Sequence, residues 1–225
     1  FNTVIWTGDA SYPRSFNAGF QTDFLWIKSR SYTGNGIALD TIRGSTKALR
    51  TSTTGAETTN TFATFDSEGF NITGTFNESN ETTVAWNWKA GGSASSNSNG
   101  TITSSVSANV DAGFSILTYT GTGAIAATIG HGLSSAPEMI IRKDRDAAVN
   151  WSVFHASMGT GNGNLSLFLN TTSAQDGGQG FMNNTAPTST VFTQGDQGFV
   201  GVNGRDYIAY AFHSVDGYSK VGSYT

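Results

Sequence analysis

Phe1-Asn-Thr-Val-Ile-Trp-Thr-Gly8 returns as Phe114-Ser-Ile-Leu-Thr-Tyr-Thr-Gly121, and Tyr218-Ser-Lys-Val-Gly-Ser-Tyr-Thr225 resembles the start of a third copy. A period of about a hundred residues is long for a solenoid repeat and suits a whole small domain. The phrase therefore predicts tandem copies of one folding unit, and it marks where each unit begins.

The similarity continues inside the units. Phe24-Leu-Trp-Ile-Lys28 aligns with Met139-Ile-Ile-Arg-Lys143, and Thr83-Val-Ala-Trp-Asn-Trp88 aligns with Tyr207-Ile-Ala-Tyr-Ala-Phe212. These matches keep their order along the chain, as copies of one unit would.

The matches divide the chain into four parts. We expect a first unit at 1–92, a Gly-, Ser- and Asn-rich connector at 93–113, a second unit at 114–217, and the start of a third repeat or an exchanged strand at 218–225. The first half of the connector has the composition of a flexible linker. The connector as a whole is interpreted as an extended segment that lies on the surface of one unit. The alternative is a strand exchanged between units or subunits.

Alternation of apolar and polar residues, bounded by Gly, Pro, Asn and Asp, predicts about seven short strands in each unit. That number is typical of an antiparallel β-sandwich or jelly roll. The predicted fold class is therefore all-β, with two tandem antiparallel β-sandwich units related by the internal repeat. The expected strands are 2–7, 23–29, 36–42, 47–52, 61–65, 69–73 and 82–89, then 114–120, 138–143, 150–155, 165–170, 190–193, 198–203 and 206–213.

The composition excludes several classes of protein. The chain is 37% hydrophobic and only 12% charged, with a net charge of −4 and scattered Lys and Arg. Such a chain has no positive surface potential that would attract nucleic acid. It also has no run of about eighteen apolar residues that could cross a membrane. The absence of cysteine excludes disulfides and thiol chemistry. We therefore expect no nucleic-acid partner and no membrane insertion.

Large and small side chains alternate in the closing strand of the first unit. Trp86 and Trp88 belong to one face, and Ala85 and Asn87 to the other, because side chains alternate across a strand. The large face is predicted to form the core, while the small face leaves room for another layer. Trp26, Trp86 and Trp88 are interpreted as core aromatics, with platforms for stacking sugars as the alternative.

The acids and histidines show no catalytic pattern. His131, His155 and His213 have no zinc-site spacing, and the acids of the first unit do not recur in the second as a pair for glycoside hydrolysis would. The sequence therefore predicts no enzyme, no catalytic residue and no metal-binding motif. Calcium on loop acids is the one cofactor that the chemistry admits, and no Asp-rich calcium loop indicates it.

Basic residues follow equivalent strands in the two units. They are Lys28 and Arg30 in the first unit and Arg142, Lys143 and Arg145 in the second. One interpretation is that they protect a hairpin from pairing at its edge. The other is a basic surface that contacts an acidic surface glycan, which makes these five the candidate binding residues.

Several phrases of the second unit also point to a family. They are Gly113 to Ile116, Tyr119 to Gly121, Gly130 to Leu133, Ala136 to Ile141 and Tyr207 to Phe212. Together they resemble the tandem repeat domains of tail-fibre and virion appendage proteins in marine bacteriophages.

This resemblance implies a lectin-like β-sandwich at the virion surface or elsewhere outside the cell. Its partners would be other copies of itself, neighbouring virion proteins and a host-surface glycan. The expected function is a non-enzymatic structural or host-attachment module, in which tandem copies bind weakly but multivalently to glycan or protein. The alternatives are a self-assembling extracellular filament subunit and a carbohydrate-active enzyme or its accessory binding domain, which a cleft with converging acids would distinguish.

Overall fold

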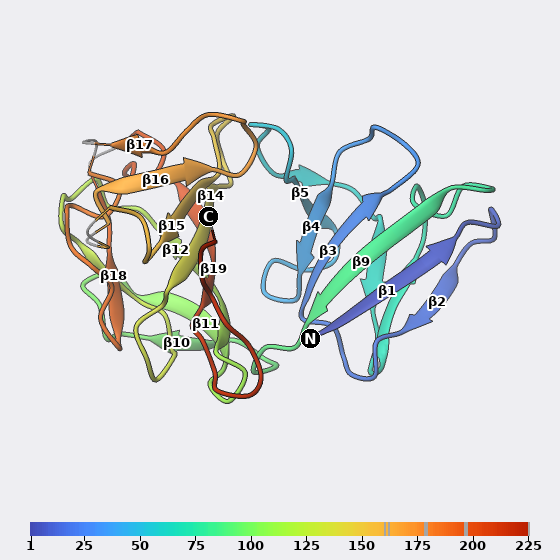
Figure 1. The fold of residues 1–225 in the computed structure, drawn as a ribbon, viewed down its shortest axis with the longest axis horizontal. Coiled ribbons are helices and arrows are strands. Elements are labelled where there is room, and N and C mark those ends of the chain that lie inside the picture. Colours follow the sequence, from blue (N-terminus) through green and yellow to red (C-terminus); the bar gives the residue numbers. More distant parts are fainter. Residues whose placement is uncertain (160, 162, 178–179, 196–197, 225) are drawn as a thin grey trace.

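A computed structural model describes residues 1–159, 161, 163–177, 180–195 and 198–224. These residues form nineteen β-strands and no helix, and every pair of neighbouring strands is antiparallel (Figure 1). The prediction of an all-β, antiparallel fold is confirmed. Within these ranges, no helix is long and apolar enough to cross a membrane.

The first half of the chain forms one large and one small sheet. The large sheet has the strand order β1-β9-β3-β4-β5-β6, and the small sheet has the order β2-β8-β7. Leu25, Ile27 and Leu39 of the large sheet share a buried cluster with Phe70 and Ile72 of the small sheet. The two sheets therefore pack as layers around an apolar core. The strands are β1 (Asn2–Thr7), β2 (Arg14–Asn17), β3 (Phe24–Ser29), β4 (Ile37–Asp40), β5 (Lys47–Arg50), β6 (Thr58–Thr59), β7 (Ala63–Phe65), β8 (Gly69–Ile72) and β9 (Thr82–Trp88).

The second half also has a large and a small sheet. The large sheet has the order β10-β11-β12-β19-β14-β15-β16-β17, and β13 pairs with β18. Leu117, Ile140 and Ala209 of the large sheet share a buried cluster with Ile129 and Phe192 of the small one. The strands are β10 (Ser95–Asn97), β11 (Ser104–Asn109), β12 (Phe114–Thr120), β13 (Thr128–Gly130), β14 (Met139–Asp144), β15 (Ser152–His155), β16 (Leu165–Phe168), β17 (Asp176–Gly177), β18 (Val191–Thr193) and β19 (Asp206–Phe212).

The two large sheets share a strand order. The run β1-β9-β3-β4-β5-β6 of the first sheet matches β12-β19-β14-β15-β16-β17 of the second. Their registers also agree, since Trp26 lies opposite Trp86 just as Ile141 lies opposite Tyr210. The second sheet differs by two additional strands, β10 and β11, which lie within 93–113 and continue it beyond β12.

The two large sheets meet across a third buried cluster. Phe24 and Leu49 from the first sheet pack there with Phe114 and Tyr210 from the second and with Trp151, which directly precedes β15. The rings of Phe24 and Tyr210 stack with centroids 4.0 Å apart. The large sheets therefore lie at the centre of the molecule and the small sheets on its outer sides, as the positions of β2 and β18 show in Figure 1.

The closing strands use their faces in the opposite way to the prediction. Ala85 of β9 and Ala209 of β19 face the clusters within each half. Trp88 and Tyr210, from the large faces, belong to the cluster between the halves. The small sheets supply bulky aromatics such as Phe70, so the strands above them need small side chains to keep the layers in contact.

Candidate functional site

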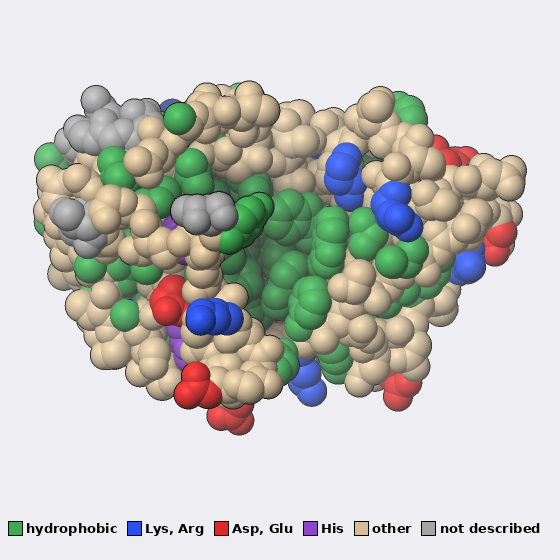
Figure 2. All heavy atoms as spheres, viewed as in Figure 1, with side chains coloured by type: hydrophobic (Ala, Val, Ile, Leu, Met, Phe, Trp, Pro, Cys, Tyr) green, Lys and Arg blue, Asp and Glu red, His purple; other side chains and the backbone are tan. Residues whose placement is uncertain are grey.

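An apolar groove of about 480 Å³ lies where the two large sheets approach each other. Figure 2 shows a hollow lined by hydrophobic side chains between the two lobes of the molecule. We call it the aromatic groove. It is lined by Phe1, Phe24, Trp26, Trp88, Lys89, Ala112, Gly113, Phe114, Met139, Ile141, Phe212, His213, Tyr218, Ser219, Lys220 and Val221.

Two cross-strand aromatic pairs build the inner wall of the aromatic groove. In the first half, Phe24 at the start of β3 lies opposite Trp88 at the end of β9. In the second half, Phe114 at the start of β12 lies opposite Phe212 at the end of β19. Ring centroids are 5.0 Å and 4.9 Å apart within the pairs, and 6.2 Å separates Trp88 from Phe212. The aligned ends of the closing strands β9 and β19 therefore bring four rings together.

Part of this aromatic surface is open to solvent. Trp26, Trp88 and Phe212 are half-buried, and Phe1 and Tyr218 are 52% and 54% exposed. The ring of Phe1 lies 4.9 Å from that of Trp88. Its amino group donates a 2.9 Å hydrogen bond to the hydroxyl oxygen of Tyr218. Exposed ring surface is what a ligand with an apolar face needs.

The rim of the aromatic groove is basic. Lys89 and Lys220 are exposed, and His213 is 8% exposed. The Nδ1 of His213 lies 2.8 Å from the carbonyl oxygen of Ser214. The residues that line the groove include no Asp and no Glu. The groove therefore suits binding of an apolar or anionic ligand and lacks the acid pair that glycoside hydrolysis needs.

The candidate basic residues do not form one surface. Arg30 is exposed, and Lys28 is half-buried with Nζ donating to the carbonyl oxygen of Gly34. Arg142 and Lys143 are 4% and 0% exposed, because β14 lies between β19 and β15 and is covered on both faces. The interpretation of Arg142 and Lys143 as parts of an exposed basic surface is therefore wrong.

The buried basic groups have internal partners. Arg142 Nη2 donates to the carbonyl oxygen of Phe181 at 3.0 Å. Lys143 Nζ donates to the carbonyl oxygens of Asp144 and Ala147 at 2.7 and 2.8 Å. Burial lowers the pKa of Lys143 to about 8, against the opposing influence of the Asp144 carboxylate. Lys143 therefore ties β14 to the loop that follows it, and Arg142 ties β14 to the segment that contains Phe181.

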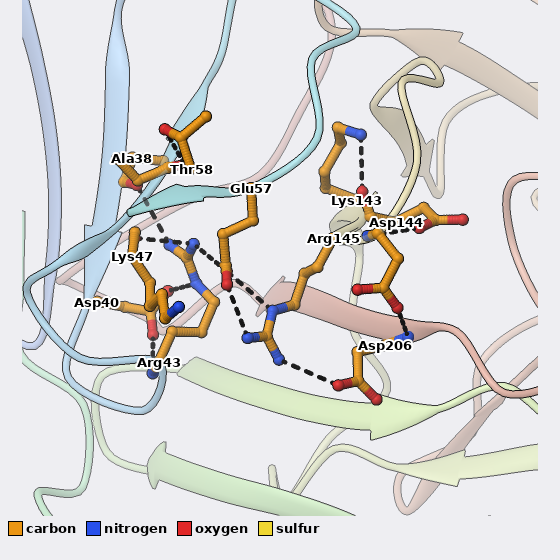
Figure 3. A network of polar contacts seen from close by, with 12 residues as sticks. Ala38, Asp40, Arg43, Lys47, Glu57, Thr58, Lys143, Asp144, Arg145 and Asp206 are labelled. Atoms are coloured by element: carbon orange, nitrogen blue, oxygen red, sulfur yellow. Dashed lines mark hydrogen bonds and ion pairs between the residues drawn. The ribbon is translucent and has the colours of Figure 1, made fainter. Parts of the chain in front are cut away.

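The fifth candidate, Arg145, belongs to a polar network that joins the two halves (Figure 3). Its guanidinium donates two hydrogen bonds of 2.9 Å to the carboxylate of Glu57. Glu57 also accepts a 3.0 Å hydrogen bond from Arg43, whose Nε lies 2.6 Å from Asp40 Oδ2. Tyr210 donates its hydroxyl proton to Asp40 at 2.8 Å. Charges from both halves are thus paired within the protein.

The electrostatics of this network keep its charges fixed. Burial opposes the charge of Arg43, yet Asp40, Tyr210 and Glu57 outweigh it and raise the pKa of Arg43. Burial would raise the pKa of Glu57, but hydrogen bonds from Arg145 and the charge of Arg43 lower it below the ordinary 4.5. Groups held this firmly in their charged forms stabilise the interface and are poorly suited to proton transfer near pH 7.

Within the part of the chain that the structure describes, no group of three or more His, Asp or Glu side chains could hold a metal ion.

Sequence reasoning missed most of the aromatic groove. The residues expected from the sequence to form a site do not include Phe24, Phe114 and Phe212. Each of these three is the first or last residue of a strand that recurs in both halves, and each lies near Trp88. That pattern of large residues at equivalent strand ends is the signal that could have identified them. Nothing in the sequence sets apart Lys89 or Lys220, which reach the groove through the path of the chain.

Taken together, the fold and the groove define an all-β protein of packed antiparallel sheets with an aromatic groove at its centre. The chain belongs to the family described as domain of unknown function DUF7483, and the match covers residues 1–225. No curated protein and no solved structure matches the chain.

Proposed function

We propose that this chain is a non-enzymatic structural and host-attachment module of a phage tail fibre or similar virion appendage. In this proposal the aromatic groove binds an acidic glycan on the host surface. The observation that carries it is the combination of exposed aromatic rings with a rim of lysines and no acid among the lining residues.

The dimensions and chemistry of the groove support a glycan ligand. A volume of about 480 Å³ lies within the usual range for small-ligand sites and accommodates one or two sugar rings. The apolar face of a sugar can stack on Trp26 or Trp88, while Lys89 and Lys220 can neutralise a carboxylate or sulfate on the same glycan. A single shallow site of this kind binds weakly, and copies in an array would compensate by avidity.

The strand arrangement supports the modular part of the proposal. We propose that the two halves are copies of one lectin-like β-sandwich, because strand order and register agree between the two large sheets. In this proposal 93–113 connects the copies, and neighbouring modules continue the array at the virion surface. Other copies of the chain and neighbouring virion proteins would be its partners.

The proposal is tested by titrating the chain with a panel of acidic and neutral bacterial surface polysaccharides. The change in tryptophan fluorescence measures binding. We expect acidic members to bind and Trp26→Ala to weaken binding about tenfold, since one stacking surface is lost. Replacing Lys89 and Lys220 by Gln should weaken binding of acidic glycans and leave neutral ones unchanged. Tyr12→Ala is the matched control, because Tyr12 is an exposed aromatic outside the groove.

Two results would contradict the proposal. If the wild-type chain binds none of the polysaccharides, or binds them equally after Trp26→Ala, the groove is not a glycan site. Release of new reducing ends during incubation would instead favour a carbohydrate-active enzyme.

A further inference from the structure

One arginine lies inside the apolar core of the second half. Arg142 of β14 is 4% exposed, and its guanidinium carbon lies 6.0 Å from the ring centroid of Phe192. The shared register of the two large sheets gives Ile27 as its equivalent in the first half, where Ile27 is fully buried in an apolar cluster. A core position that holds isoleucine in one half therefore holds a charged guanidinium in the other.

No carboxylate of the described residues forms an ion pair with Arg142. The buried carboxylate of the same strand, Asp144, pairs with Arg205 at 3.1 Å. It also accepts hydrogen bonds from the hydroxyl of Tyr207 and from two backbone amides of the following loop. Burying a charge without a counter-ion is strongly unfavourable, so the guanidinium of Arg142 calls for an anion from outside the chain.

Hydrogen-bond donors around this guanidinium still lack an acceptor. Arg142 Nη2 donates to the carbonyl oxygen of Phe181, but the buried Nη1 has no partner among the described residues. Arg142 Nε donates to Ser152 Oγ at 3.4 Å, and the hydroxyl proton of Ser152 has no acceptor in the described part of the chain. Two donors on neighbouring strands, one of them charged, are therefore free to bind an anion.

A third donor lies close to the same charge. Tyr119 is 4% exposed, and its hydroxyl has no hydrogen-bond partner among the described residues. Burial raises the pKa of Tyr119, and the guanidinium of Arg142 opposes that rise, as a positive group near the hydroxyl would. The hydroxyl of Tyr119 therefore stays protonated at neutral pH and adds to the donors around Arg142.

A small internal cavity is lined by Arg142 and Ser152. Its volume is about 10 Å³, and every described residue that lines it is buried. A cavity of this size holds one water molecule or one monatomic ion. The described lining includes no carboxylate, and none of its side chains has an unpartnered acceptor atom. Water needs acceptors for its protons, whereas an anion needs only donors, so the lining favours an anion.

We propose that Arg142 binds a chloride ion in this cavity. Nη1 of Arg142 and the hydroxyl of Ser152 donate to the ion, and the ion supplies the counter-charge that Ile27 does not need in the first half. The site is separate from the proposed glycan site, because the cavity lies inside the second half and the aromatic groove lies between the halves. The chloride site therefore stands whether or not the groove binds a glycan.

Urea unfolding of the 225-residue chain tests the site. The free energy is measured in about 200 mM sodium chloride and in about 200 mM sodium gluconate, whose anion is too large for the cavity. With a Kd of about 20 mM or lower, chloride should raise the folding equilibrium constant about tenfold or more. Arg142→Met removes the charge and should lose this dependence on chloride. Arg30→Met is the matched control, because Arg30 is exposed, and it should keep the dependence.

Crystals of the wild type grown in sodium bromide locate the ion directly, since bromide is close to chloride in size and scatters anomalously. We expect an anomalous peak within hydrogen-bonding distance of Arg142 Nη1. Bromide found only at exposed side chains, or a water molecule at that position, would overturn the proposal whether or not Arg142→Met folds. An equal response to chloride in the wild type and Arg142→Met would also overturn it, because the stabilisation would then come from a general effect of the salt.

Discussion

The carboxylate of Glu57 accepts two hydrogen bonds of 2.9 Å from the guanidinium of Arg145, a residue of the other half of the chain. The backbone amide of Glu57 also donates to the carbonyl oxygen of Arg145 at 2.8 Å. Figure 3 shows Glu57 between Arg145 and Arg43. This junction fixes how the two large sheets meet, and the aromatic groove lies between those same sheets.

We expect Glu57→Gln to destabilise the folded chain by about 2–3 kcal/mol, because Arg145 loses its nearest counter-charge and keeps only Asp206 at 3.9 Å, while Arg43 loses one of its two carboxylate partners and keeps Asp40. Urea unfolding at neutral pH measures this difference. Glu68→Gln is the matched control, since Glu68 is exposed and its carboxylate accepts a hydrogen bond from the neutral amide of Asn17. A loss for Glu57→Gln no larger than for Glu68→Gln would show that the junction adds little stability.

Acid should weaken the same junction. The folded-state pKa of Glu57 lies below its ordinary 4.5, so the unfolded state takes up the proton first as pH falls. The stabilisation from Glu57 is therefore complete above pH 4.5 and is lost as pH falls through the folded pKa. Urea unfolding from about pH 6 to about pH 3 should show a steeper loss for the wild type than for Glu57→Gln. If the unfolding free energies of the wild type and Glu57→Gln fall equally with pH, the prediction is contradicted.

The two repeated stretches of sequence, 1–8 and 114–121, each end in a glycine that the fold requires. A Cβ on Gly8 would collide with the carbonyl oxygen of Glu78, and one on Gly121 with that of Val202. Since backbone atoms cannot move aside, we expect Gly8→Ala and Gly121→Ala each to cost about 2–3 kcal/mol in urea unfolding. Gly222→Ala is the control, because no atom lies near its Cβ position. A neutral Gly121→Ala would show that this loop yields to the extra methyl group.

Much of the fold was predictable because its main strands alternate clearly. The expected strands 2–7 and 114–120 coincide with β1 and β12. Strand β11 was not predicted, because Ser, Asn and Gly around it resemble a linker and its pairing with β12 is a tertiary effect. The predicted strand at 198–203 is a turn region in the structure, where glycines interrupt the apolar residues.

The candidate site was harder to predict because it depends on which faces are covered. Arg142 and Lys143 resemble surface residues in a sequence, yet a second layer covers each face of β14. Trp26 and Trp88 were expected in a core and are half-buried in the groove, since the two large sheets separate there. Sequence periodicity shows that a strand has two faces and gives no information about what lies against each of them.

The buried amine of Lys143 gives a prediction at alkaline pH. Its pKa is lowered from 10.5 to about 8, so between these values the unfolded state binds a proton that the folded state has lost. Stability from this group therefore rises with pH across that window. Burial raises the pKa of Tyr210, which has the opposite effect once free tyrosine ionises near pH 10. The window for measurement is therefore about pH 8 to pH 10.

We expect the unfolding free energy of the wild type to gain about 1–2 kcal/mol over that window relative to Lys143→Met, measured by urea unfolding at each pH. The comparison cancels groups common to both proteins. Lys28→Met is the matched control, because Lys28 holds the equivalent position in β3 and also donates to a loop carbonyl, that of Gly34, yet is only half-buried. Lys28→Met should therefore show the same increase in unfolding free energy at alkaline pH as the wild type. If Lys143→Met keeps the gain as well, the buried amine of Lys143 is not its source.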